Sequence, residues 1–274
     1  MYGCLRRGEI FVYKVMKYKN LEIQREDKIC YVHLNRPDSL NALNSELLID
    51  ITNFSNSLSK DLETRVVIFT GKGKSFSSGA DLKEKAEHSS KLDAWRSNIG
   101  KPAIKSILDI PQITIAAVNG YCLGGAACIV SACDFRIGAA DSKIGYPEIN
   151  LGINLNWLGL PLAISLVGPA KAKRLVIGGN NESAEDLLEW GFYDQVCEGK
   201  DLIKIATEMA DLYASKPPMA AQMIKRSVNF LSLAGAEAIM HMDYDQTLLT
   251  AETKDRSEAI KAFFSGKKPE FKGD

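Results

Sequence analysis

The pattern of apolar and polar residues predicts strands at the beginning of the chain. Apolar and polar positions alternate over 21–26 and again over 29–34, around a turn at Asp27 and Lys28, which is typical of a β-hairpin. Over 41–60 the apolar residues recur at nearly helical spacing, at Leu43, Leu47 and Ile51. That spacing predicts an amphipathic helix.

Strand and helix patterns alternate through the first two thirds of the chain. Further strands are predicted at 65–70, 113–118, 135–139 and 194–197. Helices are predicted at 92–108, 125–132, 154–167, 170–177, 184–190, 201–215, 218–233 and 236–265. The alternation indicates an α/β fold, and after about Asp201 the pattern is helical only, typical of a lobe that packs on another subunit.

Two long stretches of the chain carry no charge, from 110 to 133 and from 149 to 170. By length alone each is able to cross a bilayer. Both are interrupted by helix breakers and amides, among them Pro111, Gly124, Gly125, Asn154 and Pro161. Such interruptions favour a buried strand–loop–helix path over a lipid-facing helix. We therefore expect no membrane span, and we expect the ligand site to lie in these two stretches.

Composition excludes several classes of protein. The 274 residues include 34 Lys and Arg, 34 Asp and Glu and only three histidines. A formal charge of zero argues against a nucleic-acid binder that neutralises phosphates, and the scattered histidines provide no metal motif. An apolar share of 46% is that of a globular protein rather than a disordered one.

Cysteine spacing and the basic N-terminus bear on the compartment. None of the six cysteines forms a C-x-x-C pair, so reduced thiols in the cytoplasm are expected, or in the mitochondrial or peroxisomal matrix of a eukaryotic cell. Residues 1–20 carry five basic side chains against Glu9 and lack a cleavage site of the secretory type. We interpret them as a basic extension, and a transit segment stays open as the alternative.

Three glycine-bearing segments carry the candidate chemistry. They are FSSGADLK at 76–83, NGYCLGGAAC at 119–128 and GYPEINLG at 145–152. Glycines at a helix start leave unpaired N–H groups at the positive end of the helix dipole, where they can stabilise an oxyanion. Close helix–strand packing at Gly124 and Gly125 explains the same residues equally well. From these residues alone both interpretations stay open.

The ordered set of motifs resembles the crotonase (enoyl-CoA hydratase/isomerase) superfamily from about Leu21 to Lys272. The resemblance is carried by HLNRP at 33–37, NAL at 41–43, the three segments above, AAV at 116–118, CD at 133–134, EAIKAF at 258–263 and KPEF at 268–271. It implies a spiral of ββα units over 21–200 and a C-terminal helical region over 201–274 that drives trimerisation. A homotrimer or a dimer of trimers is expected.

The same resemblance implies an acyl-CoA thioester as substrate, with coenzyme A as a part of it and neither a separate cofactor nor a metal. By motif position, the N–H groups of Ala80 and Gly125 hold the oxygen of an enolate. Lys83 and the backbone around Ala80 match positions that hold CoA, while Phe263 and Lys268 resemble C-terminal residues that reach it. The full predicted binding set is Ser78, Gly79, Asp81, Leu82, Lys83, Tyr121, Gly124, Cys128, Asn156, Trp157, Phe263 and Lys268.

The acid and base residues depart from the hydratase pattern of this superfamily. Hydratases carry two glutamates twenty positions apart, and Glu148 matches the second. The position of the first is Cys128, and a thiol is mostly protonated at neutral pH and binds water weakly. Asn156 stands where dienoyl isomerases carry an aspartate. The resemblance therefore disfavours both two-glutamate hydration and dienoyl isomerisation.

Several interpretations of the function remain. The leading one is isomerisation of an enoyl-CoA double bond, in which Glu148 removes and returns one proton while Ala80 and Gly125 hold the oxygen. The alternatives are a hydratase with an altered proton-transfer site, a decarboxylase or C–C lyase, and a noncatalytic acyl-CoA-binding trimer. Burial between Pro147 and the charge-free stretch is expected to raise the pKa of Glu148, as a general base requires. For Asn156 and Trp157, an acyl-pocket wall and ordinary capping or core packing are both open.

Overall fold

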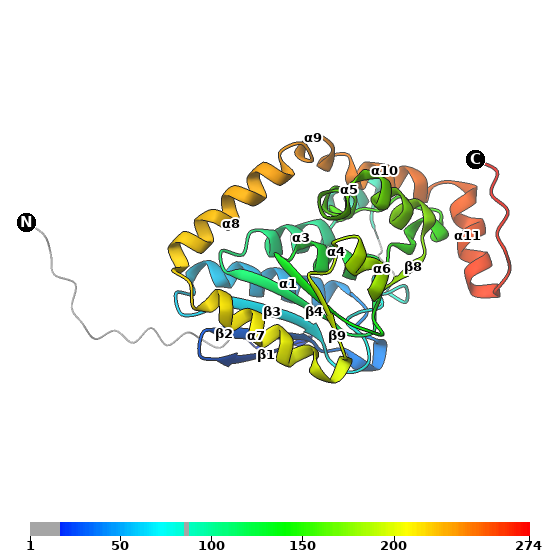
Figure 1. Ribbon diagram of the computed structural model, residues 1–274. Coiled ribbons are helices and arrows are strands. Elements are labelled where there is room, and N and C mark those ends of the chain that lie inside the picture. The colour runs from blue at the N-terminus through cyan, green and yellow to red at the C-terminus, as the bar shows by residue number, and fades with distance from the viewer. Residues whose placement is uncertain (1–16, 85–87) are drawn as a thin grey trace, which may run out of the picture.

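A six-stranded sheet forms the centre of the computed structural model (Figure 1), which describes residues 17–84 and 88–274. The first 16 residues of the predicted extension lie outside that range. In spatial order the strands are β1 (Leu21–Glu26), β2 (Ile29–Leu34), β3 (Val66–Gly71), β4 (Ile113–Val118), β6 (Phe135–Ala139) and β9 (Gln195–Cys197). Only β1 is antiparallel to its neighbour. The hairpin predicted at the start of the chain is confirmed.

Alternate side chains of the central strands enter two separate cores, one on each face of the sheet. Val67 and Phe69 of β3 pack into the larger core, while Val66 and Ile68 pack into the smaller one. All six residues of β3 are buried, as expected for a parallel strand that is covered on both faces.

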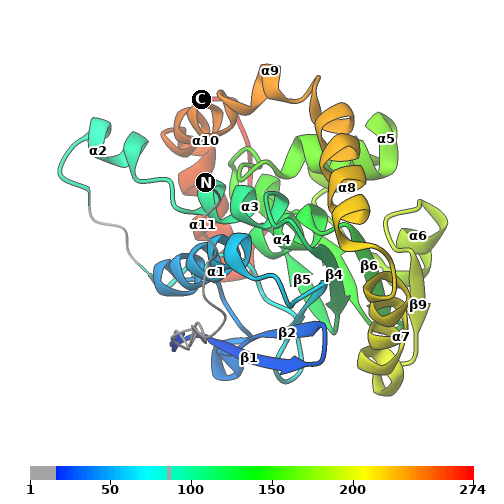
Figure 2. The ribbon, with the colours of Figure 1, turned by 90° about the vertical axis from the view of Figure 1, so that its left-hand side faces the viewer.

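Helices cover both faces of the sheet. The larger core is closed by α1 (Ser45–Ser57), α3 (Gly100–Leu108), α4 (Gly125–Ala132), α5 (Gly159–Gly178) and α6 (Ala184–Glu189). The smaller core is closed by α7 (Leu202–Ala214), which lies on the opposite side of the sheet from α1 and α4 (Figure 2). The α/β fold class predicted from the alternation of patterns is therefore confirmed.

A second sheet of three short strands carries the segments around the candidate site. Its strands are β5 (Tyr121–Leu123), β7 (Lys143–Gly145) and β8 (Asn181–Ser183). None of the three was expected, although β9, which is equally short, was predicted within 194–197. Successive strand pairs in the two sheets, each followed by a helix, give the spiral of ββα units.

Two predicted helices are each divided in the structure. The predicted helix at 92–108 is two helices, α2 (Lys91–Arg96) and α3, and the Asn98 side chain accepts the N–H of Lys101 where α3 begins. The predicted helix at 236–265 is three helices, α9 (Glu237–Met240), α10 (Asp243–Ala251) and α11 (Lys254–Ser265). Thr253 is extended and its hydroxyl caps α11 by accepting the N–H of Arg256. In each case a side chain that accepts a backbone N–H marks the start of a new helix, so the one predicted helix is divided into shorter ones.

The predicted helix at 154–167 begins five residues late. Trp157 and Leu158 have φ angles of +54° and +61°, so the backbone there is left-handed and α5 starts only at Gly159. The same helix continues across a kink at Gly168, joining the segment that was predicted as a separate helix at 170–177. Residues 154–158 therefore form a loop rather than the first turn of a helix.

The last long helix, α8 (Pro218–Leu233), carries an exposed apolar face and is anchored by one buried cation. The Nζ of Lys225 lies 2.6 Å from Oδ2 of Asp134 and donates to the carbonyl of Gln112 at 2.8 Å. The two charged side chains are 5% and 13% exposed. A pair that is so withdrawn from water holds α8 against the ends of β4 and β6.

Across residues 17–84 and 88–274, no helix combines the length and apolar character needed to cross a bilayer. The same residues contain no group of three or more His, Cys, Asp or Glu side chains suited to a metal ion.

Replacing Lys225 by methionine is expected to destabilise the protein by about 3 kcal/mol, because it leaves the Asp134 carboxylate buried without its cation. Chemical denaturation measures the loss. Lys204→Met, which removes one partner of an exposed pair at 3.9 Å with Glu208, is the matched control and should change little. If the two substitutions changed the unfolding free energy equally, the buried pair would contribute no more to stability than the exposed one.

Candidate active site

Glu148 is the central charged residue of the candidate site. It lies in η3, a 3-10 helix (Pro147–Leu151) that follows β7 and ends at Gly152, a glycine with a φ of +68°. Its side chain turns toward the start of α4, where a Cβ atom on Gly124 would come within 2.6 Å of Oε1. In the described part of the chain, the buried Oε2 atom has no hydrogen-bond partner.

Burial controls the charge of this carboxyl group. Loss of solvent raises the pKa of Glu148 from 4.5 to about 7, and only a backbone hydrogen bond opposes the shift. A carboxyl group of this pKa is present in both its acid and its base form near neutral pH. It can therefore accept a proton from a neighbouring carbon acid and return it.

The start of α4 presents an unpaired N–H group beside this carboxyl. Gly124 adopts a φ of +56° and a ψ of −123°, a conformation open to glycine, and its own N–H donates to the carbonyl of Gly145 at 2.8 Å. Gly125 is the first helical residue, so its N–H has no acceptor within the helix. The N-terminal end of α4 therefore has a free donor next to Glu148.

The turn that contains Ala80 packs against the same helix start. Ser77 pairs with Cys122 in a single β-bridge, and a Cβ atom on Gly79 would lie 2.6 Å from the carbonyl oxygen of Leu123. Ala80 forms a β-bridge with Leu43. The hydrogen bonds of this bridge use the backbone groups of the residues before and after Ala80, and not its own N–H. Among the described residues, no acceptor is bound by the N–H of Ala80. Two donors from two turns are thus brought together.

Cys128 lies one turn into α4 and is fully buried. Its Sγ is 3.7 Å from the carbonyl oxygen of Asn156. Burial raises the pKa of the thiol well above its usual value, and the nearby carboxyl groups of Glu148 and Asp243 raise it further. The position that matches the first of the two hydratase glutamates therefore holds a neutral thiol with no capacity to act as a base at pH 7.

The indole of Trp157 lies between the starts of two helices. A Cβ atom on Gly100 would come within 1.8 Å of this ring, and one on Gly125 would come within 2.1 Å. Only residues without a side chain permit such an approach. The candidate oxyanion donor Gly125 is thus in direct contact with the indole of Trp157.

Asp81 has partners that the sequence did not indicate. Its carboxylate forms an ion pair with Arg36 at 3.0 Å and accepts the N–H of Lys83 at 3.1 Å. Arg36 also donates to the carbonyl of Ala42. These contacts tie the Ala80 turn to the segment that precedes α1, so Asp81 holds the turn in place.

Side-chain amides hold the segment that precedes the Ala80 turn. Asn41 donates to the carbonyls of Lys72 and Ser75 at 3.0 and 2.8 Å, and its Oδ1 accepts the N–H of Arg36. Asn119 donates to the carbonyls of Gly71 and Gly73, each at 3.0 Å. Sequence reasoning counted both residues as parts of motifs without assigning them this role, since their partners are distant in the chain.

The remaining predicted binding residues lie at the surface of the chain. Leu82, Lys83 and Tyr121 have exposed side chains near the Ala80 turn, whereas Ser78 is half-buried and Gly79 is buried within it. Phe263 and Lys268 are exposed at the far end of α11, where the ring of Phe263 packs edge-on against Phe264. Among the described residues, neither Phe263 nor Lys268 forms a hydrogen bond or an ion pair with Glu148.

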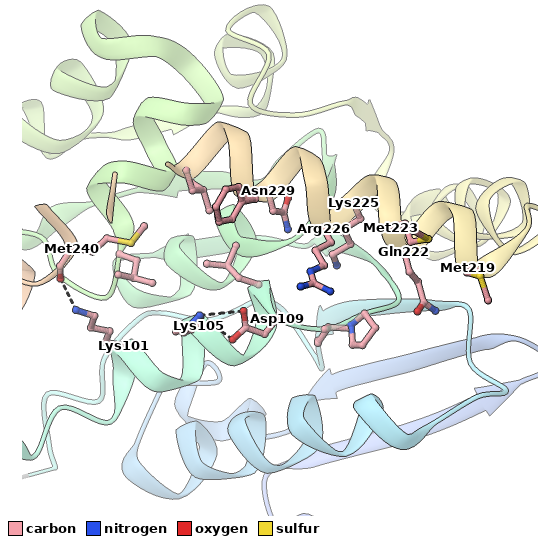
Figure 3. A pocket seen from close by; sticks show the side chains of 16 residues that line it. Lys101, Lys105, Asp109, Met219, Gln222, Met223, Lys225, Arg226, Asn229 and Met240 are labelled. Carbon is pink, nitrogen blue, oxygen red and sulfur yellow. Dashed lines mark hydrogen bonds and ion pairs between the residues drawn. The ribbon is translucent and has the colours of Figure 1, made fainter. Parts of the chain in front are cut away.

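A cavity of about 690 Å³ opens between α3 and α8 (Figure 3). Its walls combine apolar side chains of α8, such as Met223 and Phe230, with the basic residues Lys101, Lys105 and Arg226. Of the described residues, Glu148, Ala80 and Gly125 are not part of its lining. The cavity is therefore separate from the carboxyl group and donors that make up the candidate site.

The chain is similar to known proteins in both sequence and fold. The sequence model of the family described as enoyl-CoA hydratase/isomerase matches residues 24–274. The chain is 31% identical to a short-chain-enoyl-CoA hydratase of Clostridium acetobutylicum, over 93% of this chain and 98% of that protein. A crystal structure of an enoyl-CoA hydratase from Bacillus anthracis is 31% identical with a TM-score of 0.74, covering 93% of this chain and 100% of that one. An enoyl-CoA hydratase/isomerase structure from Pseudoalteromonas atlantica has the same fold, with a TM-score of 0.84 at 23% identity, covering 93% and 100%.

Replacing Glu148 by glutamine is expected to stabilise the protein at pH 8. A raised native pKa means that the unfolded chain ionises first, so the wild type loses stability as the pH rises from 4.5 toward 7. The shift corresponds to about 3 kcal/mol, a cost that the uncharged amide does not carry. Denaturant unfolding of both proteins at pH 5 and pH 8 measures it.

The matched control is Glu63→Gln, which replaces a glutamate whose side chain is exposed. This substitution should change the unfolding free energy only slightly, and by the same amount at both pH values. If Glu148→Gln gave the same change in unfolding free energy at pH 5 and at pH 8, the carboxyl group would not be desolvated.

Proposed function

Since the chain belongs to the enoyl-CoA hydratase/isomerase family, we propose that it moves the double bond of an enoyl-CoA thioester, with Glu148 as its single acid/base group. The observation that carries this proposal is the buried carboxyl of Glu148, which has a pKa of about 7 and whose Oε2 lacks a hydrogen-bond partner among the described residues. A neutral thiol, Cys128, stands where a second glutamate would be needed for hydration. One group that both takes and gives a proton is sufficient for isomerisation.

The first step is removal of a proton from C2 of a 3-enoyl-CoA. The ionised carboxylate of Glu148 accepts this proton, and the electron pair of the C–H bond moves into the thioester to form a dienolate. Its oxygen receives hydrogen bonds from the N–H groups of Ala80 and Gly125, neither of which has another acceptor among the described residues. Donors of this kind typically lower a barrier by about 3–4 kcal/mol each.

The second step returns the proton to C4. The carboxylic acid form of Glu148 delivers it there, the dienolate electrons restore the thioester carbonyl, and the double bond ends between C2 and C3. Glu148 is again ionised, and no atom has been gained or lost. Because the buried Oε2 of Glu148 has no hydrogen-bond partner among the described residues, that oxygen atom remains free for both transfers.

Hydration is the second candidate function. It is favoured by the names of relatives such as the crotonyl-CoA hydratase of Syntrophomonas wolfei, 30% identical over 93% of this chain and 99% of that protein. Hydration requires a water molecule to be oriented and deprotonated as well as a proton for C2. Cys128 does neither when its thiol is neutral and its Sγ contacts the carbonyl of Asn156. We therefore rank isomerisation first.

We extend the proposal to the CoA moiety and the assembly. Lys83 and Leu82, exposed beside the Ala80 turn, are suited to the phosphates and the adenine ring of CoA. Phe263 lies on α11 and Lys268 follows that helix, both with exposed side chains, and we assign them to the CoA site of a neighbouring subunit. The apolar face of α8, with Met219, Phe230 and Leu231 largely exposed, is the surface that a homotrimer would cover.

Glu148→Gln is expected to reduce kcat for isomerisation of a 3-enoyl-CoA by about a thousandfold or more, because the amide cannot accept the proton. In the wild type, kcat/KM should rise with pH through an apparent pKa near 7 and then level off, since only the ionised form acts as base. The absorbance of the conjugated product follows the reaction, with Glu63→Gln as the control. Full activity of Glu148→Gln would refute the mechanism.

Cys128→Glu is expected to raise hydration of a 2-enoyl-CoA by about tenfold or more, by supplying the second carboxyl group. Cys128→Ser keeps the size of the side chain and should give no gain. Melting temperatures show whether each variant is folded, as the site is fully buried. A folded Cys128→Glu enzyme that hydrates no faster than Cys128→Ser would show that position 128 is not a vacant acid site.

A further inference from the structure

One face of α10 is polar, and it binds the backbone of the loop before α5. The hydroxyl of Thr247 donates to the carbonyl of Asn154 at 3.2 Å, while the Oγ1 of Thr250 accepts the N–H of Asn154 at 3.1 Å. Gln246 accepts from the Asn154 side chain at 2.8 Å. With Asp243 these residues have the spacing of one helix face. The loop from 154 to 158 is therefore held by α10 rather than by its own hydrogen bonds alone.

Asp243 is the buried member of this face and takes no part in the proposed proton transfer. It is 7% exposed, and its Oδ2 accepts the N–H of Leu158 at 3.1 Å. Among the described residues it forms no ion pair, although the charge of Lys101 acts on it. Burial raises its pKa, which the hydrogen bond to the backbone opposes. Burying a carboxylate at this depth costs free energy unless its oxygen atoms accept hydrogen bonds.

The backbone that Asp243 binds has an unfavourable conformation. Trp157 and Leu158 are consecutive, bulky and both left-handed, at φ angles of +54° and +61°. L-residues avoid this region because Cβ comes close to the backbone carbonyl. Such a conformation persists only where surrounding contacts determine it. The N–H of Leu158 donates to Asp243, and the backbone of Trp157 also hydrogen-bonds to this carboxyl group.

The turn determines where the indole of Trp157 lies. That ring occupies the space between Gly100 and Gly125, so close that a methyl group on either glycine would overlap it. Gly125 carries one of the two N–H groups assigned to the oxyanion. If the turn relaxed to an ordinary backbone conformation, the indole would leave this position, and Gly125 would lose the wall against which it packs.

We propose that Asp243 is a positioning residue for the active site: by holding the left-handed turn at Trp157 and Leu158, it seats the indole against Gly125 and fixes the oxyanion donor. The proposal rests on the function proposed above for Gly125. It gives the C-terminal helix α10 a part in catalysis, through a residue that touches neither substrate nor reacting atom.

A role of Asp243 as an acid in the reaction would differ from a positioning role, and the asparagine variant distinguishes the two. In Asp243→Asn the oxygen of the introduced amide can still accept the N–H of Leu158, but the amide cannot transfer a proton. Positioning predicts that Asp243→Asn retains at least about half of the wild-type kcat, whereas Asp243→Ala loses about tenfold or more with KM changed much less. If both variants lost activity equally, Asp243 would be a proton donor and the positioning role would be wrong.

A double-mutant cycle tests whether the effect passes through Trp157. In a Trp157→Ala background, Asp243→Ala should lower kcat by less than about twofold, since there is no indole left to seat. Asp245→Ala is the matched control on the same helix, because Asp245 binds the indole nitrogen of Trp95 on α2 and not the loop. The proposal fails if Asp243→Ala is as active as the wild type, or if its loss is undiminished beside Trp157→Ala.

Stability measurements test the positioning role of Asp243 independently of the proposed function. Gly100→Ala should lower Tm through collision with the indole, and both Trp157→Ala and Asp243→Ala should reduce the size of that effect. This cycle needs no turnover. If no enoyl-CoA is converted but the coupling is present, the proposed function is wrong and the positioning contact stands. If Asp243→Ala leaves the Gly100→Ala effect unchanged while the wild type is active, the positioning contact is refuted.

Discussion

The desolvated carboxyl group of Glu148 is the constraint on which the rest of the site depends. Its Oε2 has no hydrogen-bond partner among the described residues, and its Oε1 lies so close to Gly124 that no side chain fits there. Burial of this kind costs folding free energy, but it also raises the pKa into the range where one group serves as both base and acid. The glycines, the turn of η3 and the unpaired N–H of Gly125 all follow from placing that carboxyl at the start of α4.

The elements of the sheet and its first covering helices were predictable, because their apolar residues form alternating or continuous runs. The strands at 21–26, 29–34, 113–118 and 135–139 and the helix at 125–132 have the bounds that the pattern predicts. The loop at 154–158 was not predictable, since its left-handed turn depends on Asp243, which lies 85 residues away in sequence. Local caps such as Thr253 likewise divide helices that hydrophobic spacing joins.

The chemistry of the site was visible in the sequence where it depends on residue type and spacing. Glu148, the glycine pair and the replacement at Cys128 are of this kind, and the structure brings them to one helix start. The supporting contacts were not visible, because an ion pair such as Arg36–Asp81 or a carboxylate such as Asp243 acts through partners distant in sequence. Asp81 stays a predicted binding residue by motif position, and its carboxylate also pairs with Arg36.

The central claim is that one carboxyl group carries a proton from C2 to C4 of the same substrate molecule. Conversion of a 3-enoyl-CoA with two deuterium atoms at C2, run in ordinary water and analysed by NMR, tests it directly. Because Glu148 is withdrawn from solvent, the account predicts deuterium at C4 of the 2-enoyl-CoA product. A product whose C4 has acquired only solvent hydrogen, or one that has gained a hydroxyl group at C3 instead, would contradict it.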